Sequence, residues 1–330
     1  MTMTPATRRA LAALLLAAAA GCAHQARPDP TVREGYVATS DGTRLYYRLE
    51  GSGPDTIVAV HGGPGVDLES IRADFLPLAA RHTVIFYDQR GAGRSDLPAD
   101  RTLLTADKQV SDLEDVRRHF GLEKMTLVAH SYGPLLAASY ALAHPGHVQA
   151  MVFFGPVPPY QGDLWKRVDA AMAKGLTPAM TAKMEDAERR LQDPAADAKE
   201  ACRDYWAVAL RPRLADPDRS LPLLKSDLCA SDPKGIRYGL TTTNAAVMES
   251  YGKWDLRDRL RALQTPVLVV HGEEEAIPMD MVQAWTASLP HARLFKVPGA
   301  AHFAYAERPE LVWPEVEKFF GAAAPPPTGR

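Results

Sequence analysis

The segment spanning residues 125–143 constrains the fold of this chain more than any other. An apolar strand-like run, MTLVAH, passes through Ser131 into a helix-like run, LLAASYALA. This order is typical of a sharp strand–turn–helix elbow that exposes a serine hydroxyl, with small residues two positions before and after the serine. Ala129 and Gly133 occupy those positions, although glycine is more usual at the first. The alternative interpretation is that Ser131 is an ordinary helix N-cap.

A serine hydroxyl is a poor nucleophile without a base to take its proton and donors to receive the developing oxyanion. Candidate partners follow other apolar runs: HGGPG at 61–65, HGEEEAIP at 271–278, and His302 after the run at 293–297. The glycines of HGGPG allow a backbone N–H to approach a substrate closely. Because sites in parallel sheets gather at the carboxyl ends of strands, we expect these groups to meet.

The rest of the chain reads as alternating strands and helices. A hairpin is expected around Ser40–Gly42, and apolar runs follow at Thr56–Val60, Thr83–Asp88, Met125–His130 and Ala150–Phe154. Apolar residues at helical spacing lie between them, which predicts an α/β fold with a mostly parallel sheet and helices on both faces. The segment 156–252 lacks the strand rhythm and is expected to form a helical cap over Ser131. The aromatic residues of this segment would either line a substrate pocket or form the core of the cap: Tyr160, Trp165, Tyr205 and Trp206.

Five motifs together resemble the α/β-hydrolases close to proline iminopeptidases. They are HGGPG (61–65), DQRGAGRS (88–95), AHSYG (129–133), HGEEEAIP (271–278) and PGAAHF (298–303). The first two are fairly specific to the iminopeptidase-like branch, whereas the elbow and the terminal histidine are shared by the whole superfamily. The resemblance covers roughly residues 34–320 and implies an α/β-hydrolase core at 34–155 and 253–320.

The resemblance also implies the roles of the site residues. Ser131 resembles the nucleophile, His302 the base and Glu275 the acid, while the amides of Gly63 and Tyr132 would form the oxyanion hole. The order serine, acid, histidine along the chain is that of the α/β-hydrolases. Within the other motifs, His61 and the charged residues of DQRGAGRS are expected to support their loops, and His130 to be local to the elbow.

The acid is the position at which this chain departs from the family. The family has an aspartate three residues after the glycine of the HG pair, where this chain has Glu275. Glutamate is an accepted third member of such triads. Glu273 and Glu274 stand beside it, so an acidic, solvated loop is the competing interpretation.

Composition excludes several other classes of function. A net charge of −2 gives no indication of a nucleic-acid partner. The chain contains no P-loop, dinucleotide-binding fingerprint or paired-cysteine metal motif, and its ten histidines are scattered. We therefore expect neither a metal nor a cofactor; the oligomeric state is left open.

The first 21 residues are predicted to be a signal peptide. Arg8 and Arg9 precede an apolar stretch that is too short for a membrane span, and this stretch ends in Ala19–Ala20–Gly21–Cys22. That ending resembles a lipobox, in which the cysteine becomes the lipidated first residue. The expected product is an exported lipoprotein of the cell envelope with a tether at 22–33. The alternative is a plain secretory peptide with Cys22 incidental.

Export affects the interpretation of the other two cysteines. Cys202 and Cys229 form an even pair in an oxidising compartment, so a disulfide between them is one interpretation and two free thiols the other. Residues 321–330, GAAAPPPTGR, are expected to be a disordered tail.

The function that these features predict is that of a membrane-tethered serine hydrolase acting on a small molecule or short peptide. A proline iminopeptidase-like aminopeptidase comes first, and a carboxylesterase or lactonase second. An aminopeptidase must hold an α-ammonium, and the acidic residues of the expected cap are candidates: Glu185, Glu188, Asp204, Asp227 and Glu249. The non-enzyme alternative is a catalytically silent lipoprotein that only binds ligands.

Overall fold

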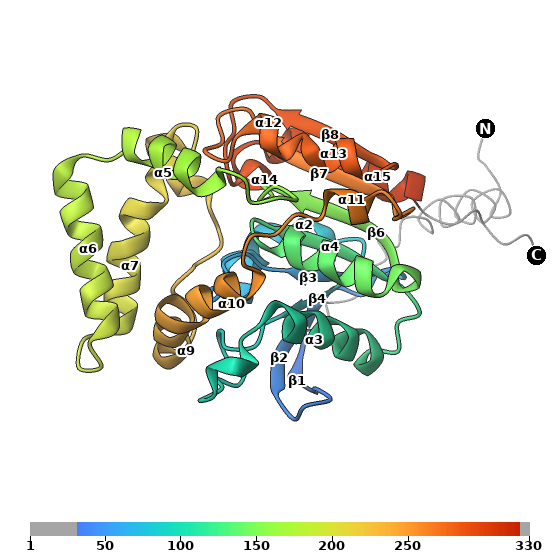
Figure 1. Ribbon diagram of the computed structural model, residues 1–330, viewed down its shortest axis with the longest axis horizontal. Coiled ribbons are helices and arrows are strands. Elements are labelled where there is room, and N and C mark those ends of the chain that lie inside the picture. The colour runs from blue at the N-terminus through green and yellow to red at the C-terminus, as the bar shows by residue number, and fades with distance from the viewer. Residues whose placement is uncertain (1–31, 324–330) are drawn as a thin grey trace, which may run out of the picture.

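The computed structural model describes residues 32–323, and its centre is one eight-stranded sheet (Figure 1). The strand order is β1-β2-β4-β3-β5-β6-β7-β8. The strands are β1 (Arg33–Ala38), β2 (Arg44–Glu50), β3 (Thr56–Val60), β4 (Thr83–Tyr87), β5 (Met125–His130), β6 (Val148–Phe154), β7 (Val267–Gly272) and β8 (Ala292–Val297).

Two kinds of strand pairing make up the sheet. The hairpin β1–β2 is antiparallel and joins β4 in antiparallel register, whereas every pair from β4 through β3, β5, β6 and β7 to β8 is parallel. The predicted mostly parallel sheet and the predicted hairpin are therefore confirmed. The parallel strands end at one edge, where the motifs that follow them meet.

Helices cover both faces of the sheet because the central strands are apolar on both sides. In β3, Val58 and Val60 pack in a core that includes residues of α3 (Ala106–His119) and α4 (Gly133–Ala143). Ile57 and Ala59 face the opposite core, to which α2 (Arg72–Ala79) and α15 (Pro309–Ala323) contribute. The alternation follows from the two-residue period of a strand. Three short helices complete the core: α12 (Met279–Val282), α13 (Ala284–Ser288) and α14 (Ala304–Glu307).

The chain between β6 and β7 forms a helical insertion, residues 155–266. Figure 1 shows α6 and α7 side by side and projecting away from the sheet, with α9 and α10 closer to it. Cys202 and Cys229 are joined in a disulfide within this insertion, in the part predicted as a cap. Its helices are α5 (Leu164–Lys174), α6 (Pro178–Gln192), α7 (Ala198–Ala209), α8 (Pro217–Ser220), α9 (Pro233–Tyr238), α10 (Asn244–Tyr251) and α11 (Arg257–Leu260).

Two predicted boundaries need correction. The tether was expected to run to residue 33, but Arg33 pairs with Leu49 as the first residue of β1. The tail was expected to begin at residue 321, but α15 continues to Ala323, because alanine is the best helix former.

The remaining terminal predictions concern residues that lie outside those described. These are the signal peptide, Cys22, the tether up to residue 31, and the tail from 324 onwards. Between residues 32 and 323, no helix combines the length and the hydropathy that crossing a membrane requires.

Candidate active site

Ser131 occupies a strained elbow between β5 and α4. Its φ of 61° is the only positive φ of a non-glycine residue within 32–323, a conformation that costs free energy and is common at functional sites. Two backbone hydrogen bonds hold the elbow to the end of β6 and to the segment that follows it. The Ser131 N–H donates to the Phe154 carbonyl at 2.9 Å, and the Ser131 carbonyl accepts from the Val157 N–H at 3.0 Å.

The structure explains the small residue two positions after the serine. A Cβ on Gly133 would lie 2.6 Å from the Val60 carbonyl oxygen, so only glycine allows α4 to approach β3 this closely. The N-cap of α4 is Tyr132, which makes no side-chain capping bond. The alternative interpretation of Ser131 as a helix cap is therefore wrong.

Glu275 and His302 form a buried hydrogen-bonded pair. The Glu275 Oε2 lies 2.7 Å from His302 Nδ1, and the two side chains are 1% and 8% exposed. Burial favours the neutral form of the Glu275 carboxyl, but the His302 imidazole, with the Ile277 N–H on Oε1, outweighs it and lowers the pKa of Glu275 below its usual value. The carboxyl is therefore held as the anion that orients an imidazole.

The neighbouring acids do not share this geometry. Glu273 and Glu274 are exposed to solvent. Their backbone N–H groups donate hydrogen bonds to the carbonyls of Val297 and Ala300, respectively. The longer glutamate at 275 thus reaches the histidine from a loop whose other two carboxylates face solvent.

The loop that carries His302 is fixed from several directions. The Ala301 N–H donates to Glu307 Oε2 at 2.8 Å, and the His302 N–H donates to the Arg213 carbonyl of the helical insertion at 3.0 Å. A Cβ on Gly155 would lie 3.1 Å from His302 Nδ1, so the imidazole packs directly on the backbone after β6. The ring therefore has little freedom to leave the cavity.

The HGGPG loop lies against the serine. A Cβ on Gly62 would lie 2.9 Å from Ser131 Cβ, and Gly63 has a φ of 105° that glycine alone adopts readily. Among the backbone hydrogen bonds of residues 32–323 outside regular elements, none is donated by Gly63 or Tyr132. Both N–H groups are thus available in the region where an oxyanion would form.

Neighbouring motif residues support these loops. His61 is fully buried, which lowers its pKa to about 4, and its Nε2 accepts the Gln89 N–H at 3.1 Å. Asp88 accepts the N–H groups of Leu68 and Arg94, each at 2.8 Å. These contacts agree with the structural roles expected from the sequence.

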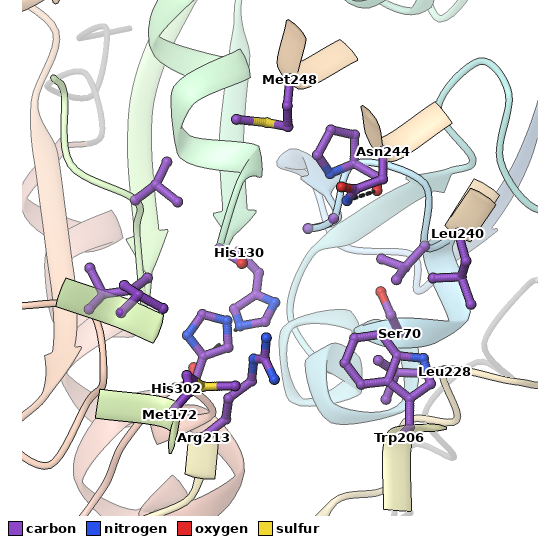
Figure 2. A pocket seen from close by; sticks show the side chains of 18 of the residues that line it. Ser70, His130, Met172, Trp206, Arg213, Leu228, Leu240, Asn244, Met248 and His302 are labelled. Atoms are coloured by element: carbon purple, nitrogen blue, oxygen red, sulfur yellow. Dashed lines mark hydrogen bonds between the residues drawn. The ribbon is translucent and has the colours of Figure 1, made fainter. Parts of the chain in front are cut away.

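Ser131 and His302 line one cavity of about 650 Å³, within the usual size of a small-molecule site (Figure 2). Gly63 and Glu275 also line it, and the helical insertion contributes Trp165, Tyr205 and Trp206. Tyr160 does not line it; this ring lies outside, with the Arg257 guanidinium 4.2 Å from its centroid.

The acidic residues of the insertion that are candidates for binding an α-ammonium differ in their surroundings. Glu188 lines the cavity, whereas Asp204 is paired with Arg190 and Lys183. Sequence reasoning missed Arg213, which lines the cavity beside His302. Nothing in its surroundings, RPRLAD, distinguishes it from a surface arginine.

One group of side chains within 32–323 has the residue types of a metal site. Glu114, His144 and His147 place ligand atoms within 4.8 Å of one another. The Glu114 carboxylate, however, already accepts hydrogen bonds from Arg117, Arg118 and Tyr140. These donors satisfy the carboxylate, so the cluster is explained as an ion-pair network.

A mostly parallel sheet, a serine on a strand–helix elbow and a carboxylate–histidine pair at the same sheet edge define an α/β-hydrolase. A family model described as the alpha/beta hydrolase fold matches residues 55–309, and the chain belongs to that family. It is distantly similar to proline iminopeptidases: it is 26% identical over 280 residues to the one from Heyndrickxia coagulans, covering 84% of this chain and 94% of that protein.

Two solved structures share the fold at lower identity. The proline iminopeptidase of Mycobacterium smegmatis has a TM-score of 0.63 at 21% identity, covering 88% of this chain and 98% of that chain. A thermophilic esterase from Thermogutta terrifontis has a TM-score of 0.64 at 21% identity, covering 88% and 99%.

Proposed function

We propose that the protein is a serine hydrolase that cleaves an acyl bond through an acyl-enzyme. The observation that supports this most is the buried Glu275–His302 pair in the same cavity as the elbow residue Ser131. The imidazole takes the Ser131 proton as Oγ bonds to the acyl carbon, and the Gly63 and Tyr132 N–H groups receive the oxyanion. His302 then protonates the leaving group, and water repeats the sequence to release the acid.

Among acyl substrates, we propose a short peptide with a small N-terminal residue first. The curated relative from Heyndrickxia coagulans is called a proline iminopeptidase, and the HGGPG and DQRGAGRS motifs point the same way. An aminopeptidase needs a group for the α-ammonium. Glu188 is the candidate, because it lines the cavity from α6.

An esterase or lactonase is the second candidate. Of the five acidic residues of the insertion considered above, Glu188 alone lines the cavity, whose walls include Val157, Met172 and Leu228. Such walls suit an uncharged acyl chain. The thermophilic esterase from Thermogutta terrifontis shares the fold.

A substrate panel tests both candidates. Prolyl and alanyl arylamides are compared with 4-nitrophenyl acetate, butyrate and valerate, using the wild type and the Ser131→Ala variant. An aminopeptidase would give a higher kcat/KM with the arylamides, and Glu188→Gln would lower that value. Higher values with the esters would favour the second candidate, and no Ser131-dependent turnover of any substrate would favour the silent ligand-binding alternative.

We further propose that the protein is exported and anchored through a lipid on Cys22. The supporting features are the lipobox-like Ala19–Cys22 segment and the Cys202–Cys229 disulfide, a bond typical of oxidising compartments. Cys22→Ser should shift the protein out of the detergent-extracted membrane fraction. Mass spectrometry that finds a mature chain without a lipid on Cys22 would contradict the anchor.

A further inference from the structure

Arg213 is a charged residue in the cavity that the proposed catalytic steps do not use. It ends a short helical turn, Arg211–Arg213, that follows α7 in the helical insertion. Its carbonyl accepts the N–H of His302 at 3.0 Å, and its side chain lines the same cavity as Ser131. Figure 2 shows the guanidinium beside His302, pointing into the cavity toward His130.

The guanidinium has few partners in the protein. One of its N–H groups donates to the Ala209 carbonyl, and its Cζ lies 5.9 Å from the centroid of the Trp206 ring. Within residues 32–323, no carboxylate oxygen lies within ion-pair distance of Arg213, whereas Arg211 in the same turn is paired with Asp218 at 2.9 Å. Most of the five donors of the Arg213 fork are therefore left for another acceptor.

Neither of the two carboxylates that line the cavity, Glu188 and Glu275, lies within ion-pair distance of Arg213. Glu275 attracts Arg213 electrostatically, but its two oxygens are occupied by His302 and by the Ile277 N–H. Burial lowers the pKa of Arg213, as expected for a cation whose desolvation no ion pair offsets. A cation in this state is stabilised by a bound anion.

We propose that Arg213 binds a carboxylate of the substrate, so that the enzyme prefers acyl substrates with a free carboxylate close to the scissile bond. This rests on the serine-hydrolase function proposed above. Carboxylate is the group that the planar guanidinium fork matches, with two parallel N–H···O bonds. Cavity walls of Trp206 and Leu228 would exclude water from that contact and strengthen it.

The carboxylate has two possible sources. In a dipeptide it is the C-terminus of the leaving group, and in a dicarboxylic monoester it lies at the far end of the acyl chain. Two matched pairs distinguish them: prolylglycine against prolylglycinamide, and 4-nitrophenyl hemiglutarate against 4-nitrophenyl valerate. In each pair the substrates differ mainly in the charge.

The expected result is a higher kcat/KM for the carboxylate member of at least one pair. Arg213→Gln should lower that preference by roughly tenfold or more, with Arg213→Lys in between. Arg211→Gln, in the same turn but outside the cavity, is the matched control and should leave the preference unchanged. Equal kcat/KM values within both pairs for the wild type, or an equal loss on both members in Arg213→Gln, would overturn the proposal.

A binding measurement separates this proposal from the catalytic one. Calorimetry with the Ser131→Ala protein compares monoethyl glutarate with ethyl valerate, and no turnover is needed. We expect roughly tenfold tighter binding of the carboxylate ester, and loss of this difference in Ser131→Ala/Arg213→Gln. Equal binding of both esters, or no change on loss of Arg213, would refute the Arg213 site even if Ser131 proved to be the nucleophile.

Discussion

Glu275 shows how a glutamate is accommodated at a position where the resemblance to proline iminopeptidases implies the shorter aspartate. Its carboxylate reaches His302 Nδ1 at 2.7 Å while the Ile277 N–H holds the other oxygen. The spacing after the HG pair favours Glu275 as the acid, with Glu273 and Glu274 as its competitors. Burial makes the choice, because Glu273 and Glu274 face solvent.

Replacing a glutamate should therefore lower kcat at only one of the three positions. Glu275→Gln keeps the shape of the side chain but removes the charge that stabilises an imidazolium. It should lower kcat by on the order of 10³–10⁴-fold, as replacing the triad carboxylate by an amide does in a serine protease. Glu273→Gln and Glu274→Gln, the matched controls, should change kcat less than about twofold, since solvated carboxylates contribute little. Steady-state kinetics of the three variants measures this.

Glu275→Asp restores the residue of the family and is the informative companion. Partial or higher activity would show that the backbone can adjust by one methylene. If Glu273→Gln or Glu274→Gln proved the sensitive change, the acid would have to be reassigned.

A buried acidic pair predicts a dependence of stability on pH. Burial raises the pKa of Asp67 to about 6, and burial together with the nearby Asp67 raises that of Asp88 well above its usual value. A raised carboxyl pKa means that the folded protein holds the proton more tightly than the unfolded chain. The contribution of Asp67 to stability is therefore present below its usual pKa of 3.8 and is lost as pH rises through about 6.

Asp67→Asn removes this dependence. The free energy of unfolding at pH 8 should rise by about 1–2 kcal/mol relative to the wild type, and the gain should shrink toward pH 4. Urea denaturation at the two pH values measures both quantities. A variant that is less stable than the wild type at pH 8 would show that the Asp67 carboxylate is needed for its hydrogen bond to the Glu69 N–H.

At the scale of elements, one buried side chain connects the histidine loop to the helical insertion. Glu307, in α14, accepts the Ala301 N–H at 2.8 Å through Oε2. Its Oε1 accepts the Ala215 N–H and the Ser220 hydroxyl, each at 2.9 Å. The loop before His302 and the helical insertion thus share a single carboxylate, which makes Glu307 a positioning residue for His302.

Glu307→Gln should weaken the hydrogen bonds that connect the His302 loop to the helical insertion. The amide replaces one acceptor oxygen with a donor, which leaves a buried N–H unpaired and should lower the free energy of unfolding by about 1–3 kcal/mol. Displacement of the His302 loop should lower kcat roughly tenfold or more with KM little changed. Glu310→Gln, which alters an exposed carboxylate paired with Arg308, is the control. Loss of stability with unchanged kcat would contradict the positioning role.

The elements of the core could be predicted because their signals are local. Apolar runs marked β3 and β5 to the residue, and the Asp–Gly turn marked the hairpin of β1 and β2. The end of α15 was predicted too early because Gly321, a poor helix former, precedes the alanines that continue the helix. Short helical turns such as Arg211–Arg213 depend on tertiary contacts, so no sequence pattern indicates that Arg213 reaches the cavity.

At the scale of the whole molecule, the catalytic arrangement depends on segments far apart in the sequence. Ser131 follows β5, Glu275 follows β7 and His302 follows β8, while Arg213 and Glu188 come from the insertion between β6 and β7. The parallel sheet brings the first three together at the carboxyl ends of its strands. That part of the site was predictable from the order of motifs. In the wall that the insertion contributes, Trp165, Tyr205, Trp206 and Glu188 were candidates from the sequence, whereas Arg213 was not.

Covalent labelling with a fluorophosphonate probe tests directly whether Ser131 is a nucleophile, since only an activated serine reacts. We expect one adduct per chain, located on Ser131 by peptide mass spectrometry and absent in Ser131→Ala, which should remain folded and lose roughly 10³-fold or more in kcat. An unlabelled wild-type protein, or an adduct on another residue that persists in Ser131→Ala, would contradict it.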